Sequence, residues 1–168
     1  MIRPIKISDA QAVCDIYNYY IENTVISFEY EKVSLDDMQA RISSTIDKYP
    51  WLVYEEQGEV VAFVYASLWK TRKAYQHTLE STVYASHKMK TKGVGTKLYE
   101  ALFDDLENDS SASLNKSRVK ALMAVIALPN EASIALHKKM GFTEAGLFKS
   151  VGYKFDQWVD VAYYQKAM

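Results

Sequence analysis

The sequence predicts a mixed α/β fold with a largely antiparallel central sheet and about four flanking helices. Three features carry this prediction: the order of strand-like and helix-like segments, the apolar run Val119–Leu128, and a glycine-bearing turn at Lys90–Thr96. The apolar run is typical of a central strand that is buried on both faces. Since 49% of the 168 residues are hydrophobic, the chain can bury a full core. We therefore expect residues 1–168 to form one domain.

The first part of the chain predicts a strand and two helices. Ile2–Ile7 is the strand candidate, and Ser8-Asp9-Ala10-Gln11 has the pattern of a helix-starting capping box. Apolar residues then recur at helical spacing, at Val13, Ile16, Tyr17, Tyr20 and Ile21. Ser34 is the N-cap candidate of a second helix, which Pro50 ends.

The middle of the chain predicts three strands and a helix. Trp51–Glu55 and Val60–Leu68 form a hairpin around a Gln57-Gly58 turn. The strand Thr78–Ala85 leads into the glycine-bearing turn, and the helix Thr96–Glu107 follows it. The helix must cross over to the next strand, so we expect Thr78–Ala85 and Val119–Leu128 to be parallel.

The last part predicts a loop, a strand, a helix and a closing pair of strands. Residues 108–116 are polar and serine-rich, which predicts a flexible loop before the Val119–Leu128 strand. Pro129-Asn130 starts the final helix, and Gly141 follows its end. Phe142–Ser150 and Gln157–Gln165 are the closing strands.

The composition excludes several classes of protein. A net charge of -1 argues against a general nucleic-acid binder. Cys14 is the one cysteine, so neither an internal disulfide nor a Cys-rich zinc site can form. The first residues lack the apolar core of a signal peptide, and no apolar run reaches the ~18 residues of a membrane span. We expect a soluble cytoplasmic protein without a metal or a membrane partner.

The turn Lys90-Thr91-Lys92-Gly93-Val94-Gly95-Thr96 predicts a phosphate site. A strand delivers it to a helix start, where free backbone N–H groups and the helix dipole attract anions. Lys90, Lys92 and Lys97 add positive charge. A dinucleotide-binding fingerprint would need glycine at Leu98, and a Walker A loop would need Gly-Lys-Ser/Thr, which the chain lacks. We therefore interpret the turn as a pyrophosphate cradle; the alternative is a helix start that needs glycine for its geometry alone.

The strand–Lys-x-x-Gly-x-Gly–helix pattern resembles the acetyl-CoA signature of the GNAT superfamily of N-acetyltransferases. Asn130 and the segment Ser133–Phe142 resemble the second half of that signature. Other segments resemble the phosphinothricin acetyltransferases within the superfamily: Ser27–Glu29, Tyr49–Val53, Trp69–Arg72, Ala74-Tyr75, Glu80–Tyr84, Ser86-His87, Ala124–Asn130, Val151–Lys154 and Trp158–Val161. Two positions depart from the usual pattern, with Lys90 in place of Arg or Gln and Thr91 in place of a frequent Gly. Lysine keeps the charge, and Thr91 requires a φ below zero.

The resemblance implies a GNAT fold that uses acetyl-CoA as co-substrate. It also implies a homodimer in which Val151–Asp156 lies near the partner's pocket. The coenzyme-binding residues that we expect are Val83, Tyr84, Ala85, Lys90, Thr91, Lys92, Gly93, Val94, Gly95, Thr96, Asn130 and Ser133. The backbone of Val83–Ala85 should pair with the pantetheine arm and direct one N–H at the thioester oxygen.

Glu80 is the candidate catalytic base. It lies in mid-strand, with Leu79, Ser81 and Val83 on the opposite face, and burial would raise its pKa towards neutrality. The alternative is a structural ion pair or an edge-strand charge. The resemblance also implies this role, because a glutamate in this motif is the base in the family.

His137 is the candidate donor of a proton to the departing thiolate. Many superfamily members carry a tyrosine at its position, and the phosphinothricin enzymes resemble this chain in having histidine. The alternative is a histidine that only packs. His77 is a second proton-carrier candidate, whereas we interpret His87 as a loop residue. Cys14 falls among core positions, which favours direct transfer over a covalent acetyl-cysteine.

Lys70, Arg72, Tyr75 and Phe28 are the candidate substrate-binding residues. Arginine can hold a carboxylate or phosphinate in bidentate fashion, although a basic surface loop is the alternative. Together with the resemblance, they predict acetyl transfer to a small anionic amino-acid-like amine, such as phosphinothricin or methionine sulfoximine. The alternatives are another acceptor (a peptide N-terminus, a polyamine or an aminoglycoside), a non-catalytic acyl-CoA sensor, or a module without a ligand.

Overall fold

A computed structural model of the chain describes residues 1–108 and 119–168. Its centre is a seven-stranded sheet in the order β1-β2-β3-β4-β5-β7-β6. The strands are β1 (Ile2–Pro4), β2 (Trp51–Glu56), β3 (Glu59–Leu68), β4 (Thr78–Ala85), β5 (Ala121–Ala127), β6 (Thr143–Lys154) and β7 (Gln157–Ala167). The helices are α1 (Ala10–Asn23), α2 (Leu35–Ile46), α3 (Val94–Asn108) and α4 (Glu131–Lys139), with 3-10 turns at Ile7–Asp9 and Lys73–Tyr75.

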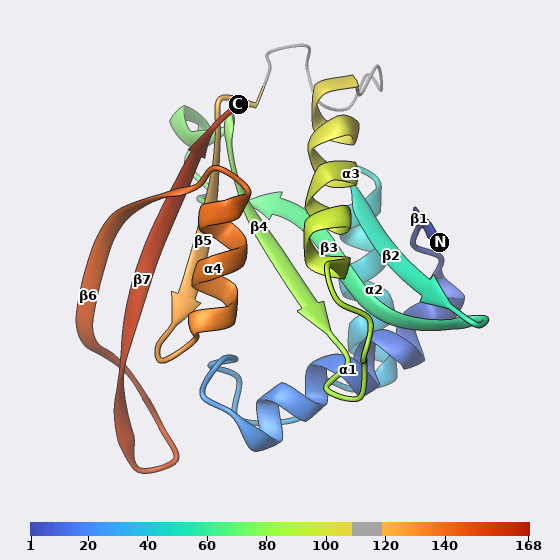
Figure 1. Cartoon of the computed structure of the whole chain (residues 1–168), viewed down its shortest axis with the longest axis horizontal. Helices are drawn as coiled ribbons and strands as arrows, with labels where there is room; N and C mark the ends of the chain where they lie inside the picture. Colours follow the sequence, from blue (N-terminus) through green and yellow to red (C-terminus); the bar gives the residue numbers. More distant parts are fainter. Residues whose placement is uncertain (109–118) are drawn as a thin grey trace.

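The helices cover the sheet on both faces (Figure 1). α1 and α2 pack on one face, where Val13, Ile42 and Phe63 belong to the same buried cluster. α3 lies on the other face, where Leu98 and Leu102 are fully buried with Leu79 of β4. Side chains of α4 pack against that second cluster. Each strand of the sheet's centre therefore presents one set of side chains to each helical layer.

The sheet divides between β4 and β5. These strands form its one parallel pair among the described residues, and the pairing covers only Thr78↔Ala121, Leu79↔Leu122 and Glu80↔Met123. Beyond it the strands diverge, whereas β5 stays paired with β7 as far as Ala127↔Val161 (Figure 1). The C-terminal half of β4 therefore faces an opening in the sheet instead of a neighbouring strand.

The structure confirms the predicted order of elements and the parallel pair. The hairpin turn lies at Gln57-Gly58, with φ of 54° and 86°. α3 begins at Val94, two residues before the predicted Thr96. No helix in the described ranges has the length and apolarity needed to cross a membrane. Beyond Asn108, the predicted 108–116 loop lies outside the described residues.

The predicted capping box at Ser8 is wrong. The chain turns one step earlier, in the 3-10 turn Ile7–Asp9, and Lys6 is its N-cap residue. The Asp9 carboxylate accepts the Lys6 N–H at 2.8 Å and also pairs with Arg3 at 2.7 Å. A carboxylate with these two partners is a stronger acceptor than the Ser8 hydroxyl, so Asp9 sets the start of the helical segment.

The closing hairpin is longer than predicted. β6 extends to Lys154 instead of ending at Ser150, and the turn to β7 is Phe155-Asp156, with φ of 51° and 57°. Neither residue is glycine, so the sequence carries no strong turn signal there. The positive φ of Ser150 (54°) and a register shift between Phe148 and Gly152 mark an irregularity inside β6.

Candidate active site

A cavity of about 580 Å³ occupies the opening between β4 and β5. Its walls come from both strands, from α4 and from the segment that follows α1; they include Glu80–Ala85, Ala124–Ala127, Ile26–Phe28, Asn130, Ser133 and His137. Because β4 and β5 are not paired here, their main-chain edges line the cavity. An elongated ligand can therefore lie along β4 and hydrogen-bond to its backbone as an additional strand would.

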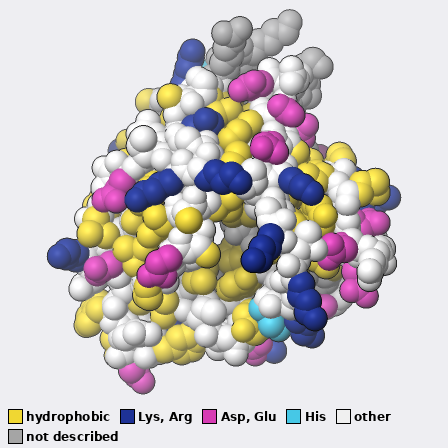
Figure 2. All heavy atoms as spheres, in the orientation of Figure 1, with side chains coloured by type: hydrophobic (Ala, Val, Ile, Leu, Met, Phe, Trp, Pro, Cys, Tyr) yellow, Lys and Arg dark blue, Asp and Glu magenta, His cyan; other side chains and the backbone are white. Residues whose placement is uncertain are grey.

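The start of α3 lies at this cavity and is suited to an anion. Gly93, with a φ of 80°, accepts the first helical bond from Lys97 N at 3.2 Å. The N–H groups of Val94, Gly95 and Thr96 therefore belong to the first turn, which has no intrahelical acceptors. Gly95 itself lines the cavity. Figure 2 shows a hollow on the face that carries α3 and α4, with several Lys and Arg side chains around it.

The geometry of the turn explains two of its residues. A Cβ at Gly95 would lie 2.8 Å from Leu136 Cδ2, so glycine lets α3 approach α4 closely. Thr91 is not among the residues with a positive φ, as the sequence required. Its hydroxyl donates to Glu56 Oε1 at 2.6 Å, which ties the turn to the end of β2. Lys90 and Lys92 are exposed.

Glu80 is the last residue of β4 that is paired with β5, at the inner end of the opening. It points to the α1–α2 face, while Leu79 and Ser81 are buried towards α3, as predicted. Burial raises the pKa of the Glu80 carboxyl, and the charge of Lys70 opposes that shift. The carboxylate is therefore a better base near neutral pH than a solvated glutamate.

His137 lines the same cavity but is only 3% exposed. Its Nδ1 lies 2.7 Å from the Ser133 carbonyl, which can only accept, so Nδ1 carries the proton. Nε2 then accepts from the Tyr99 hydroxyl at 2.7 Å, and Tyr99 in turn contacts Ser81 Oγ at 3.1 Å. Burial lowers the pKa of His137, partly offset by the Ser133 carbonyl. The ring is thus neutral and held at both nitrogens.

Phe28 forms part of the cavity wall and is held by the β6–β7 hairpin. A Cβ at Gly152 would lie 2.3 Å from the Phe28 ring. Lys154, which is 2% exposed, donates its Nζ to the Ile21 carbonyl at 2.7 Å and to the Ser27 carbonyl at 2.6 Å. The Tyr30 hydroxyl also donates to the Tyr153 carbonyl. In this chain, Val151–Asp156 therefore lies against the wall of its own cavity.

The structure does not bring every candidate residue into the cavity. Lys70, Arg72 and Tyr75 are exposed on the connection between β3 and β4 and do not line it. Lys70 is nevertheless close enough to act on the charge of Glu80. His77 lies just before β4, outside the cavity lining. His87 stacks on Tyr19 at 3.6 Å between ring centroids.

Sequence reasoning missed Tyr99 and Lys154. Tyr99 falls on the buried stripe of α3 beside Leu98 and Leu102, and a hydroxyl on such a stripe needs an internal partner. The position of Tyr99 on this stripe could therefore have predicted a buried hydrogen bond from its hydroxyl. Lys154 falls in the Val151–Lys154 segment of the family resemblance, but spacing and periodicity do not indicate its burial, because its acceptors lie more than 120 positions away. Cys14 is buried in the core, as predicted, and outside the cavity.

Comparison with known proteins decides the family. Residues 2–162 match the model of the acetyltransferase (GNAT) domain. The chain belongs to the GNAT acetyltransferase family.

Individual members of the family resemble this acetyltransferase over almost its whole length. It is 39% identical to the phosphinothricin N-acetyltransferase of Streptomyces viridochromogenes, covering 98% of this chain and 86% of the relative. It is 30% identical to the L-methionine sulfoximine/L-methionine sulfone acetyltransferase of Pseudomonas paraeruginosa, covering 98% and 92%. A solved phosphinothricin acetyltransferase of Sinorhizobium meliloti, in complex with acetyl-CoA, superposes with a TM-score of 0.89 at 29% identity, covering 100% and 88%.

Replacing Gly152 by alanine tests the packing of the cavity wall. In the acetyltransferase, we expect Gly152→Ala to displace the Phe28 ring and to lower the free energy of unfolding by about 1–3 kcal/mol, the usual cost of overpacking. Gly146→Ala on the same strand is the matched control, because its Cβ would make an ordinary contact at 3.7 Å from Phe148. Urea unfolding of both variants measures the difference. Equal stabilities would show that Phe28 is not held against this hairpin.

Proposed function

We propose that this GNAT acetyltransferase moves the acetyl group of acetyl-CoA to the amine of a small amino-acid-like acceptor, directly in a ternary complex. The chain then acts as one acetyltransferase domain. One observation carries the proposal: the opening between β4 and β5 joins the start of α3, an unpaired strand edge and the Glu80 carboxylate in one cavity. The start of α3 can bind the phosphates of a thioester coenzyme, the strand edge can bind its amide groups, and the carboxylate can take a proton from an amine.

The coenzyme would lie along the opening. Its diphosphate would accept hydrogen bonds from the N–H groups of residues 94–96, with Lys90 and Lys92 nearby. The pantetheine arm would follow the backbone of Val83–Ala85, opposite Asn130 and Ser133 of the α4 start. A main-chain N–H of this edge would stabilise the oxyanion.

Glu80 would act as the base. An α-ammonium group has a pKa of about 8, so it must lose a proton before attack. Glu80, directly or through water, takes that proton, and the amine nitrogen bonds to the thioester carbonyl carbon. A second proton passes from the nitrogen to solvent water as the tetrahedral intermediate collapses. The C–S bond then breaks, which gives the N-acetyl product and a thiolate.

The coenzyme sulfur leaves more readily if it is protonated as the C–S bond breaks, so that it departs as a thiol. His137 is the proposed source, but both of its ring nitrogens have internal partners. Ser133 Oγ lies 3.2 Å from Nδ1 and lines the cavity. The neutral ring would first take up a proton from solvent; the imidazolium would then pass its Nδ1 proton through the Ser133 hydroxyl to the sulfur, which returns the ring to its neutral form.

The acceptor class rests on the relatives and on the cavity wall. Both curated relatives are named for acetylating amino-acid analogues, phosphinothricin and methionine sulfoximine or sulfone. We propose the same class here, with Phe28 as a wall. Lys70, Arg72 and Tyr75 would meet the acceptor from the β3–β4 connection, and the electrostatic effect of Lys70 on Glu80 supports that placement.

We also propose that the enzyme is a homodimer. Its support is the β6–β7 hairpin, which exposes six large apolar side chains: Leu147, Phe148, Val151, Tyr153, Phe155 and Trp158. A patch of this kind is typical of a protein–protein interface.

We also propose, from the sequence, that the enzyme is cytoplasmic and that its chemistry does not depend on a metal.

A panel of acceptors tests the reaction. With acetyl-CoA, we expect acceptor-dependent thiol release on phosphinothricin, methionine sulfoximine or related amino acids. We expect little release with polyamines, aminoglycosides or peptide N-termini, because the basic groups near Glu80 repel cations and the cavity is small. Turnover on peptides but on no free amino acid would overturn the acceptor class. Coenzyme binding without any turnover would indicate a sensor.

Glu80→Gln tests the proposed base. We expect kcat to fall by roughly 10²–10⁴-fold, while the dissociation constant for acetyl-CoA changes little. In the wild type, kcat should fall as the pH drops through the raised pKa of Glu80, because the protonated carboxyl cannot accept a proton. The variant should lack that acidic limb. Equal losses in turnover and coenzyme affinity would contradict the assignment.

A further inference from the structure

The His137 ring can accept a second proton at one nitrogen, Nε2, because Nδ1 already carries a proton that faces the Ser133 carbonyl. The Tyr99 hydroxyl covers Nε2 at 2.7 Å, and the ring itself is buried. Tyr99 therefore stands between Nε2 and water. With the ring in this orientation, a second proton reaches His137 through the Tyr99 hydroxyl.

Tyr99 can pass on its proton only if it receives another. Its side chain is fully buried on α3, and burial raises the pKa of the hydroxyl, an effect that Ser81 partly opposes. A tyrosinate is therefore unfavourable here. The Tyr99 hydroxyl lies 3.1 Å from Ser81 Oγ, and Ser81 lines the cavity between β4 and β5. The two hydroxyls thus form a row from the cavity to Nε2, which we name the Ser81–Tyr99 relay.

The direction of each hydrogen bond in the relay follows from the number of protons. While the ring is neutral, the Tyr99 proton points at Nε2, so Ser81 is the donor to the Tyr99 oxygen. When the ring is charged, Nε2–H would donate to Tyr99, Tyr99 would donate to Ser81, and Ser81 would donate to the Met123 carbonyl, 3.3 Å away. Every proton of the relay has an acceptor in both states. The buried ring can therefore change its charge without leaving a polar atom unpaired.

The surroundings of His137 on its own face of the sheet are uncharged. Within residues 1–108 and 119–168, no charged side chain contributes to the lowering of the His137 pKa, which comes from burial and is opposed by the Ser133 carbonyl. Lys138 and Lys139 on α4 are exposed. The Phe142 ring packs edge-on against the imidazole, at 5.1 Å between centroids. The charge of the ring is therefore governed by its hydrogen bonds.

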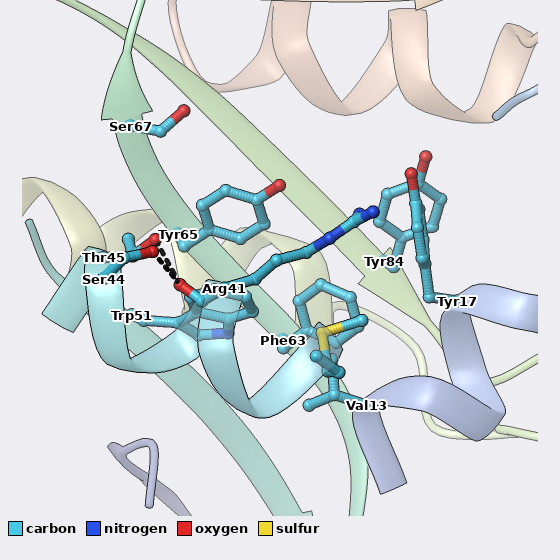
Figure 3. A pocket seen from close by; sticks show the side chains of 11 residues that line it. Val13, Tyr17, Arg41, Ser44, Thr45, Trp51, Phe63, Tyr65, Ser67 and Tyr84 are labelled. Carbon is cyan, nitrogen blue, oxygen red and sulfur yellow. Dashed lines mark hydrogen bonds between the residues drawn. The ribbon is translucent and has the colours of Figure 1, made fainter. Parts of the chain in front are cut away.

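The charged groups beside the cavity belong to the opposite face of the sheet. Figure 3 shows Arg41 extending from α2 across a pocket towards Tyr17 and Tyr84. Arg41 pairs with Glu29 at 2.7 Å, and Glu29 also accepts from the Tyr17 hydroxyl at 2.8 Å. Glu80 points to this same face. The sheet therefore separates these charges from the relay.

We infer that the Ser81–Tyr99 relay delivers a proton to Nε2 of His137 and stabilises the imidazolium that protonates the departing sulfur. This inference rests on the proposed function. Ser81 and Tyr99 are positioning residues, because they act on the sulfur through His137. Their hydroxyls solvate the charged ring in a place where bulk water is excluded.

The protons balance along the relay. The amine nitrogen releases a proton to cavity water, and water gives one to Ser81 Oγ. The Ser81 proton bonds to the Tyr99 oxygen as the Tyr99 proton bonds to Nε2, so both hydroxyls are restored and the ring gains one positive charge. Nδ1 then passes its proton through Ser133 to the sulfur. The ring returns to its first tautomer when Nδ1 takes a proton back through Ser133 and Nε2 returns one along the relay.

NMR titration of the His137 ring tests the relay without any substrate. His137→Gln identifies the signals of this ring among those of the three histidines. In Tyr99→Phe we expect the midpoint of the titration to fall by about one pH unit, because a hydrogen bond to a charged group is worth more than one to a neutral group. In Ser81→Ala we expect about half that fall, since Tyr99 loses the acceptor that it needs when the ring is charged. The neutral ring should keep its proton on Nδ1 in both variants, because the Ser133 carbonyl remains.

Tyr164→Phe is the matched control. Tyr164 is 2% exposed, and its hydroxyl contacts Glu144 at 3.3 Å, so its removal should leave the His137 titration unchanged. With acetyl-CoA and phosphinothricin, we expect kcat of Tyr99→Phe to be about tenfold lower where the ring is mainly neutral, because the imidazolium is about tenfold scarcer. The control should stay within about twofold.

Three results would overturn the inference while the proposed function stands. They are an unchanged titration in both Tyr99→Phe and Ser81→Ala, a shifted titration with unchanged kcat, and a wild-type His137 ring that stays neutral throughout the pH range in which the protein is folded. Absence of wild-type turnover on every acceptor would overturn the proposed function, whereas the titration would still decide whether the relay exists.

Discussion

The parallel pairing of β4 and β5 ends after three residue pairs, and the candidate site depends on where it ends. A β-strand leaves its N–H and C=O groups unsatisfied wherever it has no neighbour. Here that stretch is the β5-facing edge of the C-terminal half of β4, where the Ala85 carbonyl accepts from the Tyr20 hydroxyl at 2.6 Å, and it faces a cavity instead of bulk solvent. A ligand with amide groups, such as pantetheine, can satisfy that edge. The opening therefore leaves main-chain groups that a ligand can hydrogen-bond to, and it sets the direction in which an elongated ligand lies, which is along β4.

The position of Glu80 follows from the same constraint. It is the last residue of β4 in register with β5, so its backbone is fixed while the chain beyond it lines the cavity. One face of β4 carries Glu80 towards α1 and α2, and the other carries Ser81 into the hydrogen-bonded group of Tyr99 and His137. The two proposed proton-handling groups thus approach the opening from opposite faces of the sheet. Their separation suits a reaction in which one proton is taken from nitrogen and another is given to sulfur.

Sequence reasoning succeeded where local chemistry determines structure. The glycine turn, the order of elements and the facing of Glu80 follow from spacing and from the period of a strand. It failed where a stronger neighbouring acceptor competes, as at Ser8, where the carboxylate of the adjacent Asp9 takes the capping role. It also failed where partners lie far apart in the chain, as with Lys154 and the carbonyls of Ile21 and Ser27. The ion pair between Arg41 and Glu29, at 2.7 Å, is a further example, because nothing near either residue in the sequence indicates that they pair.

A crystal structure of the protein with bound coenzyme A tests the account most directly. We expect the diphosphate oxygens to lie within about 3 Å of the N–H groups of residues 94–96. We also expect the pantetheine arm to follow Val83–Ala85 and the sulfur to lie in the cavity that Glu80 lines. A coenzyme bound elsewhere, with the opening between β4 and β5 empty, would contradict it, as would a Glu80 carboxylate directed away from the sulfur.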